Sequence, residues 1–510
     1  MKPLAPAAAL ALAPLLLLAG CPRHREPPGI GRRVAAGEVR ALAPSADGEY
    51  LAYLDACAPL QARAVPAGTF TCDLRVVPSA GGEPVRVAGG VTTLPGGWAW
   101  SGEGHVLAAL DQPDLATGEG TLVAWVPGGP PRRLGEGVGY WAFARRGRLL
   151  GFVWRGHLQL WRPGAEAVPL EGVDRVATFE FHPRGEEGSP LLLVRQVPSA
   201  GAGLLAVTPG RKPVRAGGPT GDYAFSPRGD RFAFTERSGE GYALHLAGSA
   251  APGAPGPALG EGIADFAFSR DGARLAFVAG MAPGRQGDLW VAGGPGKPVR
   301  MAAGVGEMRW ATGAERLAWL EGYDPRARSG AIATGAPGEP SPPLARNVSS
   351  FVIAPAGDAV AFLRHSSQGG YSVDLELARG GKPVPVAKGV FGFDFAPGGG
   401  ELWFRTACTR SSEACELWSA PVADPAKARK IADGVKSFEF DRERPGRLLL
   451  GWSRQDRVAL ELAVWEAGKL TPVDSSAVPG SAAFLAPGGR RLAWAVNDPK
   501  RPGVYVADLP

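Results

Sequence analysis

Apolar and polar positions alternate in short runs along most of this chain, and the runs recur in a fixed order. Residues 223–234 read YAFSPRGDRFAF, and residues 266–277 read FAFSRDGARLAF. In the first copy Ser226–Gly229 fill a type I turn, because serine accepts a local hydrogen bond, proline presets the backbone and glycine tolerates a positive φ. The apolar residues on either side repeat with period two, which predicts strands. Each copy therefore predicts a β-hairpin.

The hairpin pattern recurs eleven times, with turn glycines from Gly48 to Gly489 and a mean period of about 44 residues. Beyond the two quoted copies, clear ones lie around Trp100, Phe143, Ile353, Phe395 and Leu485, and weaker ones near Tyr50, Phe181, Trp310 and Phe440. Each hairpin is followed by a third apolar segment, such as residues 288–293, and a fourth, such as 297–304. Four short strands per period predict an all-β fold, a β-propeller of about eleven four-stranded blades that stack to bury their faces.

The two chain ends complement each other. The last period stops after its third strand, GVYVADL at 503–509, whereas RRVAAGEV at 32–39 resembles a fourth strand without its first three. We expect the N-terminal strand to complete the final blade, because this removes exposed sheet edges. Eleven blades exceed the usual four to eight, so two packed propellers are favoured, with one large ring as the alternative. The Gly/Pro/Ala-rich stretch 247–262 is either the division between them or a long loop within one blade.

The hairpins FSPRG and FSRDG, followed by strands of the LAF type, resemble the repeats of TolB-type, WD-like β-propellers of bacterial envelopes. The resemblance covers nearly everything after residue 33. It implies a periplasmic protein whose propeller docks other envelope proteins. The Tol-system propeller is itself soluble in the periplasm, whereas this chain also has the features of a lipid anchor.

The first residues predict that anchor. Residues 1–20 read as a signal peptide whose apolar stretch is too short to span a bilayer comfortably, and they end in Leu18-Ala19-Gly20 before Cys21, as in a bacterial lipobox. We expect lipidation of Cys21; an ordinary secretory signal with a chance cysteine is the alternative. Residues 21–33 would then be the lipidated cysteine and a polar tether, and residues 34–510 the repeat array. Pro22 favours the outer membrane, facing the periplasm, by resemblance to enterobacterial sorting.

The chain has five cysteines, and the four beyond Cys21 form two pairs. Each pair flanks the loop between the second and third strands of one blade, where sheet pairing brings the two ends within reach of a disulfide. The predicted bridges are Cys57 with Cys72 and Cys408 with Cys415. Two isolated pairs in different blades do not make four metal ligands, so a metal site is the weaker interpretation.

Composition agrees with an exported β protein. The 74 glycines and 49 prolines fall between apolar segments, and no sustained helical period follows the signal. The formal charge of +6 is small for 510 residues, and the basic residues are scattered. This pattern excludes a nucleic-acid-binding stripe and a polybasic membrane patch.

A search for catalytic motifs finds none. The nearest matches to Gly-x-Ser-x-Gly are GYSVD at 370–374 and GWSRQ at 451–455, and both lack its final glycine. The six histidines are dispersed without metal-ligand spacing: His24, His105, His157, His182, His245 and His365. Asp47, in SADGEY, reads as a turn residue. We therefore predict no enzyme activity, no metal and no cofactor.

The fourteen tryptophans raise the possibility of ligand stacking, but most occupy strand positions where large rings pack blade against blade. These are Trp100, Trp290, Trp310, Trp319, Trp403 and Trp494. Trp141, after Tyr140, is a candidate for a channel mouth. The favoured function is a lipid-anchored, non-enzymatic module that binds envelope proteins. The alternative is a propeller enzyme or a binder of a small ligand such as a sugar, lactone or cofactor, with its site assembled from several blades.

Overall fold

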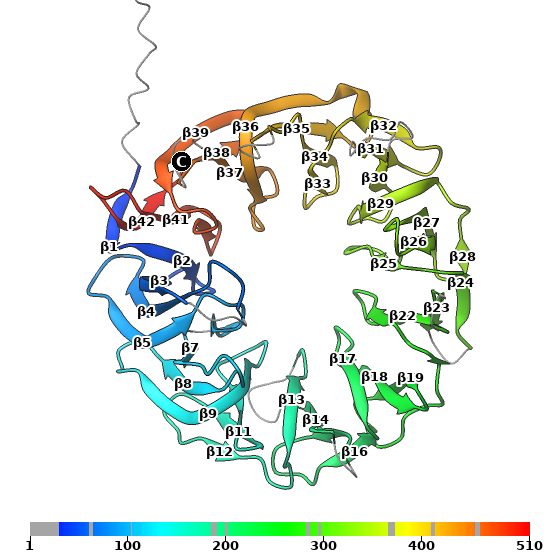
Figure 1. Ribbon diagram of the computed structural model, residues 1–510, viewed down its shortest axis with the longest axis horizontal. Helices are drawn as coiled ribbons and strands as arrows, with labels where there is room; N and C mark the ends of the chain where they lie inside the picture. Colours follow the sequence, from blue (N-terminus) through cyan, green and yellow to red (C-terminus); the bar gives the residue numbers. More distant parts are fainter. Residues whose placement is uncertain are drawn as a thin grey trace, which may run out of the picture.

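Each repeated segment of the sequence forms one four-stranded antiparallel sheet in the computed structural model, and these sheets are arranged as blades of a ring (Figure 1). The structure describes residues 30–60, 65–103, 105–184, 191–198, 202–281, 286–293, 297–365, 373–409, 414–453 and 459–509. Within these ranges the strands form eleven blades, as the sequence predicted.

The first five blades follow the chain order. Blade 1 contains β2 (Val39–Pro44), β3 (Tyr50–Pro59), β4 (Phe70–Pro78) and β5 (Val85–Thr92). Blade 2 contains β6 (Trp98–Trp100), β7 (Leu107–Asp111), β8 (Gly120–Trp125) and β9 (Arg132–Phe143). Blade 3 shares β9 and adds β10 (Leu150–Trp154), β11 (His157–Trp161) and β12 (Val168–Pro169). Blade 4 contains β13 (Val176–Phe181), β14 (Leu192–Gln196), β15 (Leu204–Val207) and β16 (Val214–Gly217). Blade 5 contains β17 (Thr220–Phe225), β18 (Arg231–Ser238), β19 (Gly241–Gly248) and β20 (Gly260–Glu261).

The next three blades complete the opposite side of the ring. Blade 6 contains β21 (Asp265–Phe268), β22 (Arg274–Ala279), β23 (Asp288–Gly293) and β24 (Val299–Ala302). Blade 7 contains β25 (Glu307–Trp310), β26 (Leu317–Asp324), β27 (Ser329–Ala336), the short β28 (Glu339–Pro340) and the start of β29 (Ala345–Ile353). Blade 8 continues from β29 with β30 (Val360–His365), β31 (Val373–Ala378) and β32 (Val384–Ala387).

The last three blades return to the start. Blade 9 contains β33 (Gly392–Phe395), β34 (Glu401–Thr406), β35 (Cys415–Pro421) and the start of β36 (Arg429–Phe440), with a short 3₁₀ turn η1 (Pro425–Lys427) before β36. Blade 10 continues from β36 with β37 (Arg447–Ser453), β38 (Leu460–Glu466) and β39 (Lys469–Ala477). Blade 11 contains β40 (Ala483–Leu485), β41 (Arg491–Val496), β42 (Gly503–Asp508) and the N-terminal β1 (Arg32–Ala36).

The turn that the repeated pattern predicts is present in blade 5. The backbone N–H of Gly229 donates to the carbonyl oxygen of Ser226 at 2.8 Å, which closes the four-residue turn. Gly229 has φ +75°, in the region that favours glycine. The flanking strands pair in register, with Phe225 opposite Phe232. The hairpin prediction is confirmed.

The hydrophobic core is divided among the blade junctions. Eleven clusters of buried hydrophobic residues occur in the described ranges, and each joins two neighbouring blades. Between blades 7 and 8, for example, Leu320 and Ile332 pack with Phe351 and Phe362, all fully buried. Each blade therefore buries both of its faces against its neighbours.

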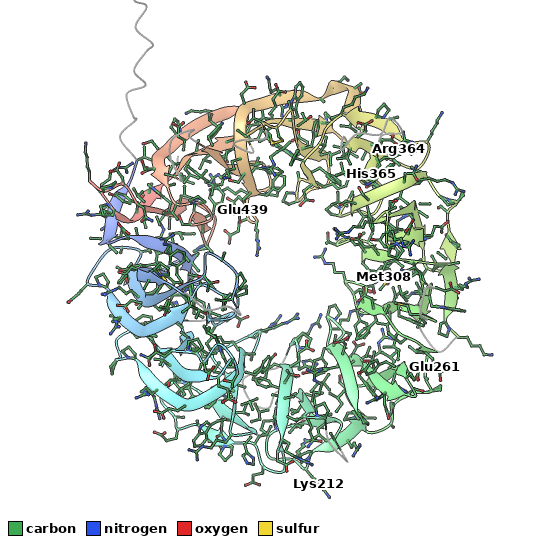
Figure 2. All side chains as sticks on the ribbon, viewed as in Figure 1. Lys212, Glu261, Met308, Arg364, His365 and Glu439 are labelled. Atoms are coloured by element: carbon green, nitrogen blue, oxygen red, sulfur yellow. A yellow bond between two sulfur atoms is a disulfide. The ribbon has the colours of Figure 1, made fainter. Side chains whose placement is uncertain are left out.

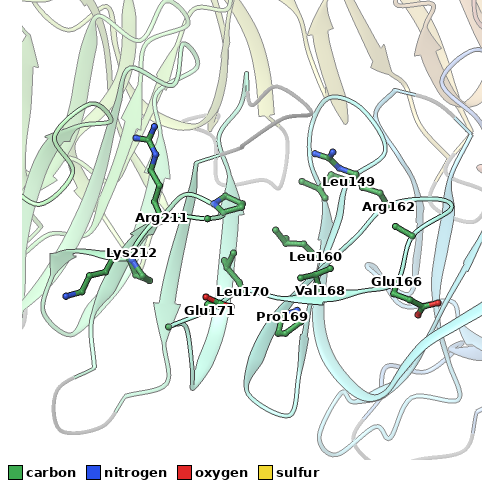
Figure 3. Close-up of a pocket in the computed structure, with 15 residues that line it drawn as sticks. Leu149, Leu160, Arg162, Glu166, Val168, Pro169, Leu170, Glu171, Arg211 and Lys212 are labelled. Carbon is green, nitrogen blue, oxygen red and sulfur yellow. The ribbon is translucent and has the colours of Figure 1, made fainter.

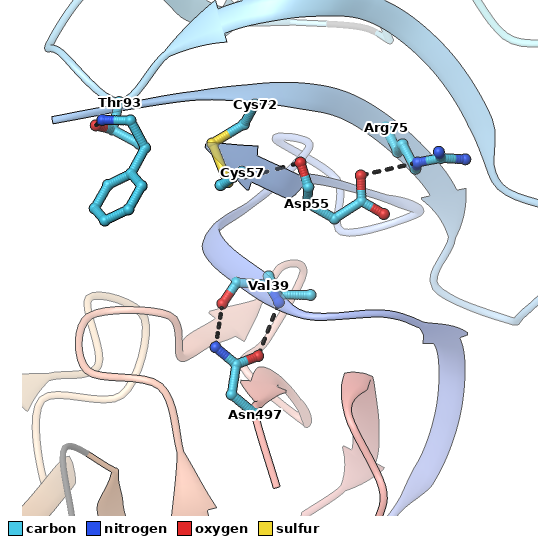
Figure 4. The surroundings of a disulfide bond; sticks show 8 residues. Val39, Asp55, Cys57, Cys72, Arg75, Thr93 and Asn497 are labelled. Carbon is cyan, nitrogen blue, oxygen red and sulfur yellow. Dashed lines mark hydrogen bonds and ion pairs between the residues drawn. A yellow bond between two sulfur atoms is a disulfide. The ribbon is translucent and has the colours of Figure 1, made fainter. Parts of the chain in front are cut away.

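The ring closes where the sequence predicted. Strand β1 pairs antiparallel with β42, with Arg33 opposite Tyr505. Blade 11 then packs on blade 1, where the Asn497 side chain exchanges two hydrogen bonds with the backbone of Val39, at 2.8 and 3.0 Å (Figure 4). The preference for two packed propellers is wrong, because every junction, including this closing one, is covered by a shared core. The chain forms the single large ring, and its central opening stays open when the described side chains are drawn (Figure 2).

The Gly/Pro/Ala-rich stretch 247–262 lies within blade 5. It connects β19 to β20, which pair with each other through Leu244 and Gly260. The stretch is therefore a loop inside one blade.

Most of the tryptophans lie in the core, as predicted. Trp319, Trp403 and Trp494 are fully buried. Trp100, Trp290 and Trp310 are partly buried and pack against junction clusters. Trp141 packs against the cluster between blades 2 and 3, and its ring meets Phe143 edge to face at 6.0 Å. It is thus part of a blade junction.

Candidate functional site

Both disulfides that the sequence predicted are present. Cys57 is bonded to Cys72, with Cα atoms 4.1 Å apart, and Cys408 to Cys415, with Cα atoms 4.0 Å apart. Figure 4 shows the first bridge beside the ion pair of Asp55 with Arg75, which is 2.9 Å long. Each bridge closes the loop between the second and third strands of its blade. The predicted lipidation residue, Cys21, lies outside the described residues, and so does His24. Within the described ranges no helix is long and apolar enough to cross a membrane.

The hairpin turns of successive blades contact each other, and the histidines of two turns take part. His182 Nε2 lies 2.8 Å from the carbonyl oxygen of Gly229 in the next blade. His105 Nε2 contacts Asp47 Oδ2 of the preceding blade. These histidines therefore serve as links between neighbouring turns.

The contact of His105 also brings together a group that sequence reasoning missed. Asp47, Glu49 and His105 offer donor atoms that all lie within 4.8 Å of one another. Asp47 Oδ1 already accepts hydrogen bonds from Ser45 Oγ at 2.7 Å and from the N–H of Glu49 at 3.1 Å. Partial burial acts to raise the pKa of Asp47, but these hydrogen bonds and His105 outweigh it, and the pKa is lowered. Since both carboxylate oxygens are engaged, the arrangement fits a turn and a blade junction better than a metal site.

A second polar cluster is built from the first strands of blades 3 to 5. Thr178 Oγ1 and Tyr223 Oη are 2.9 Å apart, and Tyr140 Oη donates to the carbonyl oxygen of Phe179 at 3.2 Å. Burial raises the pKa of Tyr223 to about 12 and also raises that of Tyr140. Both phenols therefore stay protonated near neutral pH and act as hydrogen-bonding groups.

Glu180 belongs to the same cluster and is the group with the most altered acidity there. Burial raises its pKa, and the nearby Arg145 and the backbone N–H of Phe225 oppose this only in part. Such a group can hydrogen-bond a polar ligand in either protonation state. The first strand of blade 10 carries another carboxylate, Glu439, which lies toward the central opening in Figure 2.

The largest groove described lies between blades 3 and 4, and Figure 3 shows its walls. It has a volume of about 760 Å³, within the range of about 300 to 1,000 Å³ of ligand pockets. One wall is the segment 165–172, which includes β12, and the other is the segment 209–213, which precedes β16. Leu149 and Leu160 contribute to the apolar floor. We call this site the blade 3/4 groove.

The blade 3/4 groove combines apolar surface with unpaired positive charge. The side chain of Val168 is 60% exposed, which is high for a valine on a strand. Figure 3 shows Arg211 and Lys212 on one side of the apolar floor and Arg162 on the other. Within the described part of the chain, none of these three cations has an ion-pair partner within 4 Å. Glu166 is already paired with Arg132 at 2.5 Å.

Sequence reasoning did not find this groove. Its residues come from two blades and from loops that look like ordinary turns. One signal was available: the exposed Val168 interrupts a polar segment, where the core pattern does not require an apolar residue.

The comparisons with known proteins identify no family. No family model matches the chain, and no curated protein matches it.

Solved structures that match are β-propellers at low identity. One described as the crystal structure of the eukaryotic initiation factor has a TM-score of 0.42 and 12% identity, with 72% of this chain and 95% of that chain covered. The Dos1 propeller has a TM-score of 0.36 and 9% identity, with 66% and 92% covered. The β-propeller domain of the Trilobed protease from Pyrococcus furiosus has a TM-score of 0.31 and 13% identity, with 57% and 95% covered. At these values the description of the fold rests on the strand pairing of this chain itself.

Proposed function

We propose that this protein is a lipid-anchored docking module of the bacterial cell envelope, which binds other envelope proteins through its propeller and performs no catalysis. The observation that carries the proposal is the short distance along the chain between the lipobox cysteine and the ring. Cys21 precedes Arg32, the first residue of β1, by eleven residues. Because an extended residue spans at most about 3.6 Å, the tether holds the ring within about 40 Å of the lipid.

The way the tether joins the ring supports the same proposal. Strand β1 is the outermost strand of blade 11, and it pairs with β42 alone. A chain leaving β1 toward a membrane therefore starts at the rim of the ring. Both loop-bearing faces then remain open to proteins of the periplasm.

The two disulfides support an oxidising compartment, where such bonds form and persist. The resemblance of the FSPRG and FSRDG hairpins to TolB-type repeats favours the periplasm and protein partners. An outer-membrane location facing the periplasm is part of the proposal and follows from Pro22 after the lipidated cysteine.

The test is in-cell crosslinking of the full-length chain, followed by purification and mass spectrometry, with Cys21→Ser as the control variant. We expect reproducible capture of one envelope protein, weakened when the anchor is lost. We also expect Cys21→Ser to abolish lipid labelling and to release the chain from membranes. If the wild type captures no specific partner, the docking function is refuted. The polar cluster around Glu180 and Tyr223 then becomes the first place to look for a small ligand.

A further inference from the structure

The blade 3/4 groove has an equivalent elsewhere in the ring, and the comparison shows what is special about it. Between blades 7 and 8, a groove of about 660 Å³ is lined by residues 341–344 and by residues 380–383. These segments occupy the same places in their blades as 165–172 and 209–213. We call this second site the blade 7/8 groove.

Hydrogen bonds align the two grooves residue by residue. The carbonyl oxygens of Leu149 and Arg316 each accept the hydrogen bond that closes a hairpin turn, at 2.9 and 2.8 Å. Leu160 lies opposite the second residue of β10, and Thr334 lies opposite the second residue of β26. Leu149 thus corresponds to Arg316, and Leu160 to Thr334.

The outer walls align in the same way. The N–H groups of Leu170 and Leu344 donate to the third strands of their blades at equivalent positions, both at 2.8 Å. Counting back two residues, Val168 corresponds to Pro342. The blade 3/4 groove is therefore apolar at positions where the blade 7/8 groove has an arginine, a threonine and a proline.

The positive charges differ as well. Lys212 and Lys382 are equivalent, since each begins a Lys-Pro-Val run. Arg211 corresponds to Gly381, and Arg162 to Ala336. Two additional cations thus flank the groove whose floor is also more apolar. The general architecture of a blade junction requires neither change, because the blade 7/8 junction forms without them.

We propose that the blade 3/4 groove binds an extended peptide segment of a partner protein, with apolar side chains on the floor and acidic residues at both ends. This inference rests on the proposed docking function and names its binding site. Charge complementarity decides the occupant, because cations stand on both sides of the apolar floor (Figure 3). A peptide can place a carboxylate on each side, whereas a fatty acid or a single lipid headgroup satisfies only one. Prolines 169, 209 and 213 line the walls and limit the ordering that binding would require.

The test begins with a random heptapeptide library displayed on phage and selected on the full-length chain in detergent. We expect enrichment of peptides with apolar centres flanked by aspartate or glutamate. The affinity of an enriched peptide, measured by fluorescence anisotropy, should fall at least about tenfold with Leu160→Thr, which installs the residue of the blade 7/8 groove. Arg211→Glu should weaken binding more at about 50 mM salt than at about 500 mM, because salt screens exposed charges. Lys382→Glu, in the blade 7/8 groove, is the matched control and should leave the affinity unchanged.

Several outcomes would overturn the proposal. One is a selection without enrichment, and another is enriched peptides that bind both groove variants as well as wild type. A third is binding of the Cys21→Ser chain to phosphatidylglycerol vesicles that is lost with Arg211→Glu, which would identify a lipid site. In the crosslinking experiment, groove variants that keep the captured partner would refute this site while leaving the docking function intact.

Discussion

The junction between blades 10 and 11 contains a buried ion pair whose removal has a calculable cost. Asp474 has a fully buried side chain and accepts two hydrogen bonds from the Arg501 guanidinium, at 2.7 and 2.6 Å. Trp494 Nε1 and the N–H of Ser476 donate to the same carboxylate at 3.1 and 2.9 Å. Arg501→Met keeps most of the side-chain volume but leaves the carboxylate buried without its counter-charge.

The expected cost follows from that burial. Removing one partner of a buried ion pair destabilises a protein by about 3 to 5 kcal/mol. About 480 residues unfolding together, at about 2.1 cal/mol/K each, have an unfolding entropy of about 1 kcal/mol/K. We therefore expect Arg501→Met to lower the melting temperature by about 3 to 5 °C.

A double-mutant cycle isolates the ion pair. Asp474→Asn removes the charge but keeps an oxygen that can accept from Trp494 Nε1. In that background Arg501→Met should cost only about 1 °C, so the two substitutions should couple by at least about 2 kcal/mol. The measurement is scanning calorimetry of all four proteins.

The control is an exposed ion pair. Arg133 and Glu136 lie 2.9 Å apart with both side chains mostly exposed, so Arg133→Met should shift the melting temperature by less than about 1 °C. The reasoning is refuted if Arg501→Met behaves like this control, or if the two substitutions in the cycle are simply additive.

Three further predictions follow from other parts of the ring. Cys72→Ser should cost about 3 kcal/mol by the chain-entropy estimate for its 15-residue loop, measured as a lower melting temperature that reductant does not lower further. The raised pKa of Glu180 means that the folded state binds its proton more tightly than the unfolded chain, so its contribution to stability falls as pH rises through that raised pKa; Glu180→Gln should therefore gain stability over wild type at pH 7 and lose this advantage near pH 4, followed by thermal unfolding at both pH values. Val34→Asp puts a charge into the closing junction and should speed tryptic cleavage after Arg33, while Val168→Asp on the exposed β12 should not; equal rates would show that β1 is not held by this contact.

Local features of this protein could be predicted from its sequence because their causes are local. The hairpin at Ser226–Gly229 needs only a turn and two alternating strands, and both are written in consecutive residues. The closing strand β1 was predicted because a missing fourth strand and a surplus strand match in number. The disulfides followed from the position of each cysteine pair at the two ends of one loop.

The candidate sites could not be predicted because their residues meet across blades. His105 and Asp47 are 58 positions apart and meet only because their blades are neighbours. The blade 3/4 groove depends on the difference between Leu160 and Thr334, which becomes meaningful only once the two blades are aligned by their hydrogen bonds. A single exposed apolar residue such as Val168 does not reveal in the sequence which surface it faces.

The sequence by itself determined the blade as the repeating unit, the count of eleven and the strand that closes the array, because period, turn chemistry and strand alternation are properties of neighbouring residues. Only the tertiary structure decided that eleven blades make one ring. The angle between two blades depends on how the side chains of both fill their shared junction, as Leu320, Ile332, Phe351 and Phe362 do between blades 7 and 8. That packing is a property of pairs of faces, and a linear pattern of apolar residues does not specify it.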